Sequence, residues 1–325
     1  EIAGVTVIDE RTVEIELVSP VASYLNRLTL PGAFIIAEGS APEEGAITDP
    51  VCTGAYELRE FIQQDRVVLD AYNDYWGGAP DVQEVIIRVI PEQSVQVIEY
   101  EAGGLDIATV PESEIRRIEN DPNLSDQLSI VPTLSNFHLR INHNDPVMGD
   151  VRVRQALAKA IDRETIIATV LQGLGEPALG LYPPALAVHD PEFDTLAYDP
   201  DAARALLADA GYPDGIELEV RTGQIETERR VVNAITQTAA AAGINFVVNA
   251  TEKSVYDQDR GQCEMQMGTI FWGLDYPDPE NIAGVIVAGT SGSRNACGYG
   301  EHEAVEEVEA LYDEAVADRK STRLN

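Results

Sequence analysis

Apolar and polar residues alternate along the chain with two different periods. Segments with an apolar residue at every second position predict strands, and segments with apolar residues three and four positions apart predict helices. Strands are expected at residues 5–8, 12–18, 55–61, 66–72, 85–90, 105–110, 128–131, 137–142, 217–222, 245–250 and 265–271. Helices are expected at residues 21–28, 91–102, 112–120, 151–160, 163–172, 199–210, 226–242 and 301–318. Because strands and helices alternate with short connections, the sequence predicts a mixed α/β fold.

The helix expected at 151–160 has a well-marked start and two basic residues in its first turn. Asp150 is suited to cap the helix. Arg152 and Arg154 are candidates for ligand anchors, but arginines on a helix surface of an acidic protein more often pair with neighbouring carboxylates. The apolar residues expected to face a sheet are Val151, Leu157, Ala158 and Ile161.

The strand near residue 140 has one polar and one apolar face. Side chains alternate between the faces of a strand, so Phe137, Leu139 and Ile141 share the apolar face. The polar face carries Asn136, His138, Arg140 and Asn142. Such a face suits a binding cleft, and an edge strand with a wet outer face is the alternative.

An aromatic residue and a carboxylate follow the strand expected at 265–271. Trp272 and Asp275 come at its end, and prolines at 277 and 279 stiffen the exit. An aromatic face beside a carboxylate suits a cationic or amine-bearing ligand. From the sequence alone a buried Trp272 in the core is the more common case.

Several motifs occur in the order found in one transport family. They are DPVCTGAY (49–56), YWGGAP (75–80), DVRVRQALAKAIDRE (150–164), YDPDAARALLADAGYPDG (198–215), WGLDYPDPENI (272–282) and NACGY (295–299). In these motifs the chain resembles the solute-binding proteins of peptide/nickel-type ABC importers, family 5, which have the periplasmic-binding-protein type II fold. The matches extend over nearly the whole chain.

The resemblance implies a two-lobed α/β fold, present here as a fragment truncated at both ends. Residues 1–49 then correspond to the remnant of an extra N-terminal subdomain, residues 50–142 to part of lobe I, and residues 143–325 to lobe II, incomplete at its C-terminus. No signal segment is visible, which we interpret as truncation. The basic tail from Lys320 to Asn325 does not fit the acidic helix before it and is set aside.

The family's function gives further expectations. The chain should capture a di- or oligopeptide, or a similar amine-bearing solute, between its lobes and deliver it to ABC permease subunits. It should be extracytoplasmic and held at the membrane, as a lipoprotein, by an anchor outside this fragment. The same fold with nickel chelate, haem or oligosaccharide as its cargo is an alternative. A sensory adaptor that reports ligand to a receptor is another.

The resemblance also gives roles to individual residues. It assigns Asp275 to the α-amino group of a peptide ligand, and Trp272 then stacks on the ligand. Tyr276 is a weaker candidate. His138 and Arg140, with Asn136, are expected in the cleft. Peptide-binding relatives often have a tyrosine and an acid near these positions, so Arg140 is a departure that favours a ligand carboxylate.

The net charge of the chain limits the classes of molecule that it can bind. The formal net charge is −34, and acidic residues are spread along the whole chain. This pattern resembles proteins of salt-loving microbes, because a Debye length of about 3 Å at 1 M salt would screen the repulsion. Nucleic acid is therefore not expected as a partner. The 44% hydrophobic content of the 325 residues excludes wholesale disorder and allows two lobes.

Signals for an enzyme are weak, and no cofactor is expected. The segment from His302 to Glu306 lacks the second histidine of a zinc protease helix, and no Gly-x-Ser-x-Gly occurs. His138 and His143 are close in sequence, but two ligands do not make a metal site.

The cysteines number three. Cys263 and Cys297 flank one excursion of the chain, so a bridge between them is conceivable in an exported protein. Cys52 replaces a glycine of the family motif and is expected to be a small buried residue.

Overall fold

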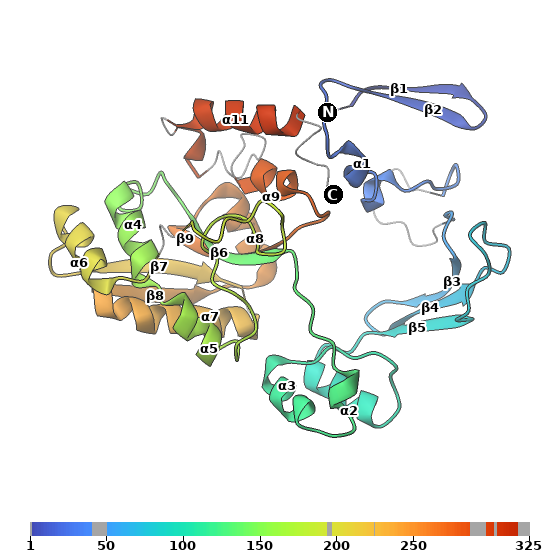
Figure 1. Cartoon of the computed structure of the whole chain (residues 1–325), viewed down its shortest axis with the longest axis horizontal. Helices are drawn as coiled ribbons and strands as arrows, with labels where there is room; N and C mark the ends of the chain where they lie inside the picture. The colour runs from blue at the N-terminus through green and yellow to red at the C-terminus, as the bar shows by residue number, and fades with distance from the viewer. Residues whose placement is uncertain are drawn as a thin grey trace. The chain divides into compact units, whose positions relative to one another are not determined.

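The computed structural model describes residues 2–40, 51–193, 197–223, 225–286, 297–301 and 304–317. His302 and the tail from Lys320 to Asn325 lie outside this range. The chain divides into two compact units, one formed by Glu1–Arg27 with Val131–Asn325 and the other by Leu28–Ile130. Each combines helices with strands, which confirms the predicted α/β class (Figure 1).

The larger unit is built on a mixed sheet with the strand order β6-β9-β7-β8. Its strands are β6 (Ser135–Ile141), β7 (Ile216–Thr222), β8 (Ile244–Ala250) and β9 (Met267–Gly273). β7 is parallel to both β8 and β9, whereas β6 is antiparallel to β9. The polar-faced strand β6 is therefore paired directly with β9, the strand that contains Trp272.

Helices pack against this sheet and enclose the core (Figure 1). They are α4 (Val151–Ala160), α5 (Arg163–Thr169), α6 (Pro200–Asp209) and α7 (Glu226–Ala239). The largest fully buried side chains of the core are Met148, Val153, Leu207, Leu218, Val220, Val232, Ile244 and Met267. Burial of this apolar surface provides most of the stability of the unit.

The buried face of α4 differs from the predicted one. Leu157 and Ile161 are buried as expected, but Val151 is 50% exposed. The buried residues of the helix are Val153, Ala156, Leu157 and Ala160. These four residues follow one another at intervals of three, one and three positions, which places them on one face of the helix. Val151 lies outside this buried face.

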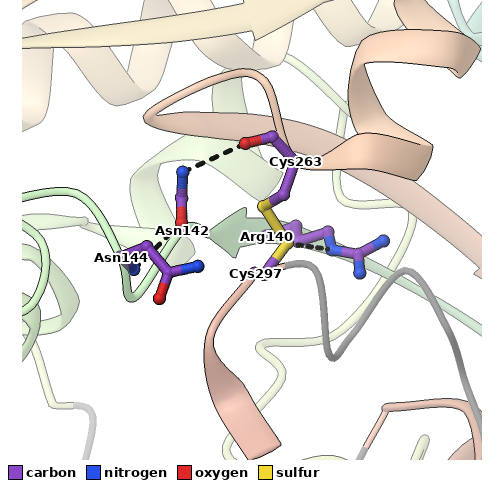
Figure 2. The surroundings of a disulfide bond; sticks show 5 residues. All are labelled: Arg140, Asn142, Asn144, Cys263 and Cys297. Carbon is purple, nitrogen blue, oxygen red and sulfur yellow. Dashed lines mark hydrogen bonds between the residues drawn. A yellow bond between two sulfur atoms is a disulfide. The ribbon is translucent and has the colours of Figure 1, made fainter. Parts of the chain in front are cut away.

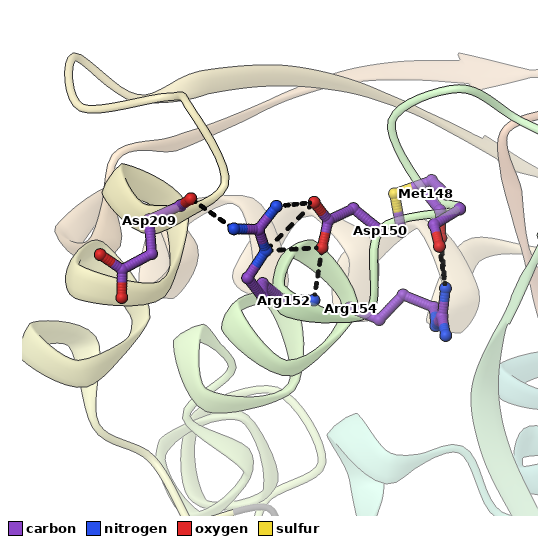
Figure 3. Close-up of polar contacts among 6 residues, drawn as sticks. Met148, Asp150, Arg152, Arg154 and Asp209 are labelled. Carbon is purple, nitrogen blue, oxygen red and sulfur yellow. Dashed lines mark hydrogen bonds and ion pairs between the residues drawn. The ribbon is translucent and has the colours of Figure 1, made fainter.

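The two arginines at the start of α4 bind groups of the protein itself (Figure 3). Arg152 pairs with the N-cap Asp150 at 2.6 Å and donates to the carbonyl of Asp209 at the end of α6. Arg154 donates to the carbonyl of Met148 at 2.8 Å. The ion pair expected for Arg152 is confirmed, whereas Arg154 satisfies backbone carbonyls before the helix.

The smaller unit contains a three-stranded antiparallel sheet in the order β3-β4-β5 and two helices. These elements are β3 (Tyr56–Ile62), β4 (Arg66–Ala71), β5 (Glu84–Arg88), α2 (Gln93–Glu101) and α3 (Glu112–Glu119). The strands predicted at 105–110 and 128–131 are wrong, because neither segment has a ladder partner in the described part of the chain. Cys52 is exposed, contrary to expectation. Its backbone pairs with Ile36 in an isolated antiparallel β-bridge.

The remaining α-helices and strands belong to the larger unit, and short 3₁₀ turns occur in both units. β1 (Ile2–Asp9) and β2 (Thr12–Leu17) form the predicted hairpin, and the helix expected at 21–28 is one turn, α1 (Tyr24–Arg27). Near the C-terminal end lies α11 (Val305–Ala317). The sequence missed α8 (Lys253–Gln262) and α9 (Pro279–Ile286). Short 3₁₀ turns lie at Pro31–Ala33, Ser125–Gln127, Ala240–Ala242 and Tyr299–Glu301.

Candidate functional site

The register of β6 and β9 brings predicted site residues to one face of the sheet. Asn136 pairs with Trp272, and Arg140 pairs with Gly268. Paired residues of an antiparallel ladder lie on the same face, so Asn136, Trp272 and Arg140 share one. On the opposite face Phe137, Leu139 and Ile141 pack against the core, as predicted. The two-faced character of β6 is therefore confirmed.

Asn136 and His138 are hydrogen-bonded within this face. The side-chain amide of Asn136 donates to the carbonyl of Leu181 at 3.0 Å, and its oxygen lies 2.8 Å from His138 Nδ1. Burial, and then the charge of Arg140, lower the pKa of His138 to about 4. At neutral pH His138 is therefore an uncharged hydrogen-bonding group and not a cation.

Arg140 lies against a disulfide bond (Figure 2). Cys263 and Cys297 are bonded, with their Cα atoms 5.2 Å apart, which confirms the bridge that the sequence left as a hypothesis. Arg140 Nε donates to the sulfur of Cys297 at 3.2 Å, and Asn142 donates to the carbonyl of Cys263 at 3.0 Å. The polar face of β6 thus holds both halves of the bridge.

The charge of Arg140 is incompletely neutralised by its surroundings. Among the described residues no carboxylate forms an ion pair with it. Burial and the nearby charge of Arg260 lower its pKa, but a guanidinium keeps its charge at neutral pH. A disulfide sulfur is a weak acceptor, so the other guanidinium N–H groups can bind an oxygen.

The loop after β9 presents Asp275 to solvent, whereas Trp272 lies on β9 itself. Asp275 is exposed, and its backbone N–H donates to Asn281 Oδ1 at 3.1 Å. Asn281 Nδ2 donates in turn to Asp275 Oδ2 at 3.3 Å. Trp272 is half-buried, and its indole N–H has no acceptor in the described part of the chain.

Tyr276 is buried and binds a carboxylate of the protein. Its hydroxyl donates to Glu280, which also accepts hydrogen bonds from Ser23, Arg27 and Tyr312. Burial, and then the bond to Glu280, raise the pKa of Tyr276 to about 12. Burial alone would raise the pKa of Glu280, but the hydroxyls of Tyr276 and Tyr312 and the charge of Arg27 outweigh it and lower that pKa.

Sequence reasoning missed Glu280 and Asn281. Both lie in the first turn of α9, which the two prolines concealed, because we interpreted them as a stiff exit from β9. The usable signal was Asp278 followed by Pro279, since aspartate at the N-cap and proline at the first helical position mark a helix start. Asp278 accepts a hydrogen bond from the N–H of Glu280 at 2.9 Å, as a cap does.

Neither a metal centre nor a membrane span is found in the described part of the chain. Across the described ranges no group of three or more His, Cys, Asp or Glu is placed to hold a metal ion. His143, one of the paired histidines considered above, packs edge-on against Tyr299 with ring centroids 5.8 Å apart. Within the same ranges no helix has the length and apolar character needed to span a membrane.

Comparison with known proteins gives a consistent result. The family described as bacterial extracellular solute-binding proteins, family 5 Middle, matches residues 1–294. The dipeptide-binding protein of Escherichia coli (strain K12) is 27% identical over 86% of this chain and 55% of its own length. Heme-binding protein A of Haemophilus influenzae is 25% identical over 95% of this chain and 58% of its own length. This chain therefore spans little more than half of these relatives.

A solved structure supports the predicted fold. The dipeptide-binding protein from Pseudoalteromonas sp. SM9913, in complex with Met-Leu, superposes with a TM-score of 0.82 at 21% identity, over 100% of this chain and 65% of that one. The predicted periplasmic-binding-protein type II fold is confirmed. Other similar proteins are named for glutathione binding or were solved with a nickel–histidine complex, so the fold alone does not specify a cargo.

Proposed function

The chain belongs to family 5 of the bacterial extracellular solute-binding proteins, and on this basis we propose that it captures a di- or oligopeptide, or a similar amine-bearing solute, for an ABC importer. Proteins of this family are extracellular or periplasmic and work with ABC permeases. The role is one of binding without catalysis. Attachment to the membrane as a lipoprotein, and a high-salt habitat, are further parts of the proposal.

Asp275 is the observation that carries the amine-binding proposal. It is an exposed carboxylate whose backbone and side chain are both held by Asn281. Trp272 lies three positions before it, near the end of β9, and is half-buried. A carboxylate beside an aromatic ring attracts an ammonium group both by charge and by the ring quadrupole.

The other end of the solute would meet the polar face of β6. Arg140 is the cation best suited to a carboxylate or carbonyl oxygen, because its guanidinium donates to only a weak acceptor in the described residues. His138, being uncharged, would contribute a hydrogen bond, and Asn136 would fix the orientation of His138. Tyr276 would support the loop through Glu280.

A second cargo class is favoured by the same arginine. Haem, nickel chelates of amino acids and acidic sugars carry carboxylates that Arg140 would bind, while Asp275 would repel them. The alternative to transport is a sensory adaptor, which would bind the ligand at the same site and report it to a receptor. The relative contributions of Asp275 and Arg140 to affinity would distinguish peptide from purely anionic cargo.

The test is a titration of the full-length protein with the dipeptide Met-Leu, followed by mass spectrometry of any solute retained on purification. Trp272 is one of the 2 tryptophans of this chain, and a parallel titration of a Trp272→Phe variant isolates its part of the fluorescence change. Asp275→Ala should weaken Met-Leu by roughly 2 to 5 kcal/mol, whereas Asp214→Ala, at another exposed aspartate, should change little. Unchanged affinity after Asp275→Ala would refute the amine-anchor role.

A further inference from the structure

The first turn of α9 carries two polar side chains that are almost fully enclosed. Asn281 is 6% exposed, and the side chain of Glu280 is 11% exposed. Polar groups are rarely buried without hydrogen-bond partners, because losing water without replacement is costly. Both side chains turn back to the loop that precedes the helix, so α9 holds that loop by side chains as well as by its backbone.

Asn281 contacts Asp275 at two points. Its side-chain oxygen accepts from the backbone N–H of Asp275, and its side-chain nitrogen donates to Asp275 Oδ2. A carboxamide has one accepting and one donating end, so this pairing fixes both the backbone and the carboxylate of Asp275. Asp275 Oδ1 accepts no hydrogen bond from the described part of the chain. One carboxylate oxygen is held and the other is available.

The neighbouring residue, Tyr276, is anchored mainly through Glu280, and the side chain of Asn281 also reaches its hydroxyl. Tyr276 donates to Glu280, and Glu280 is itself bound by Ser23, Arg27 and Tyr312. The loop is thus held at two successive residues by two successive residues of α9. Among the described residues the hydrogen bonds of Glu280 go to Ser23, Arg27, Tyr276 and Tyr312 and those of Asp275 to Asn281, so loss of a bond to Glu280 tests the stability of the cluster without removing a bond to the Asp275 carboxylate.

We infer that Asn281 is a positioning residue, which orients the carboxylate of Asp275 so that its free oxygen receives the ammonium group of the solute. This inference rests on the proposed function. A carboxylate held before binding loses less side-chain freedom when the ligand arrives. Asn281 would therefore contribute to the preference for an amine without touching the solute.

The experiment measures the dissociation constants of Met-Leu and N-acetyl-Met-Leu, which lacks the charged amine, and takes their ratio. In the unmodified protein the acetylated peptide should bind more than about 10-fold more weakly. Asn281→Leu, which keeps the volume but neither polar end, should reduce that ratio by about 3- to 10-fold, with the affinity for N-acetyl-Met-Leu unchanged. Tyr312→Phe is the matched control, because it removes one buried hydrogen bond to Glu280 and should leave the ratio unchanged.

Each outcome has a separate meaning. If Asn281→Leu does not fold, Asn281→Ser, which is smaller and polar, is measured with the same expectation. In an Asp275→Ala background either substitution should leave the ratio unchanged. A ratio that stays at its original value in both Asn281 variants would overturn the positioning role. If the unmodified protein binds neither peptide, or binds both equally, the proposed amine anchor fails instead.

Discussion

Glu280 should be among the polar side chains most important for the stability of the larger unit. Its two oxygens accept from four donors. Oε2 accepts from Ser23 at 3.1 Å and from Tyr276, and Oε1 accepts from Arg27 at 2.7 Å and from Tyr312 at 2.8 Å. These hydrogen bonds join the N-terminal segment that holds Ser23 and Arg27 to α9 and to Tyr312 of α11. Glu280→Gln keeps the shape of the side chain but replaces one oxygen with an NH₂ group.

Either orientation of that amide removes two of the four donated bonds. The NH₂ group faces either the Arg27 guanidinium and the Tyr312 hydroxyl, or the Ser23 and Tyr276 hydroxyls, and only a hydroxyl can turn to accept from it. A buried donor that loses its acceptor costs about 1 to 3 kcal/mol. Arg27 is 33% exposed, so water compensates part of its loss, and the smaller cost of burying an amide offsets a further part. We therefore expect Glu280→Gln to lower the free energy of unfolding by about 2 to 4 kcal/mol.

The assay is urea denaturation followed by the fluorescence of Trp272 in a Trp76→Phe background. Asp201→Asn is the control, because its ion pair with Arg204 is highly exposed, with Asp201 at 85%, and should contribute less than about 1 kcal/mol. A loss for Glu280→Gln no larger than that of the control would refute the reasoning.

The same cluster predicts a dependence on pH. The pKa of Glu280 is lowered, so its contribution is complete above about 4.5, its ordinary value, and is lost as the pH falls below that. The pKa of Tyr276 is raised from 10.0 to about 12, so its contribution is complete below pH 10 and is lost as the pH rises towards 12. The difference in stability between the original protein and Glu280→Gln should therefore shrink in acid.

Three further predictions concern other parts of the larger unit and the surface. His138 should titrate near pH 4 by NMR, and because this lies below its ordinary value of 6.5, His138→Gln should reduce the loss of stability between pH 6.5 and 4. Peptide mapping without reductant should recover Cys263 bonded to Cys297 and Cys52 as an alkylated thiol, and replacing both bridged cysteines with serine should cost about 2 to 4 kcal/mol for a sequence separation of 34. The melting temperature should rise steadily from low salt to molar KCl, since the net charge is −34, and a flat or falling curve would exclude adaptation to high salt.

Local signals predicted much of the larger unit. α4 spans the predicted 151–160, and its N-cap Asp150 accepts the N–H of Arg152 as the sequence indicated. β7 and β8 begin one residue before the predicted positions and end where expected. Hydrophobic period and capping chemistry are properties of neighbouring residues, so a single sequence reveals them.

The elements that were missed depend on contacts with distant residues. α8 is almost entirely polar, and its main buried side chain, Tyr256, donates to the carbonyl of Thr269 on β9. Its apolar period is therefore too weak to predict a helix. Residues 105–110 have the apolar pattern of a strand but do not form one. An apolar segment becomes a strand only where a ladder partner is available.

The candidate site was predictable as a set of residues but not as an arrangement. The motif pointed to Trp272 and Asp275, and the period of two gave the polar face of β6. That Asn136 lies opposite Trp272 follows from the pairing of β6 with β9, which are far apart in sequence. That Asn281 holds Asp275 follows from the direction in which α9 leaves the loop. Neither relation can be read from local spacing.

The structure also changes what a polar strand face implies. Asn136 binds the carbonyl of Leu181, His138 binds Asn136, and Asn142 binds the carbonyl of Cys263, so three of the four polar residues satisfy groups of the protein itself. Substituting Asn136 or Asn142 should therefore act mainly through stability. Arg140 differs, because its recorded acceptor is a sulfur, and a charged group with unused donors is the one best able to select a ligand. Chemical selectivity would then rest on two opposite charges, Arg140 on β6 and Asp275 after β9, each held in place by a neighbour that does not itself bind the solute.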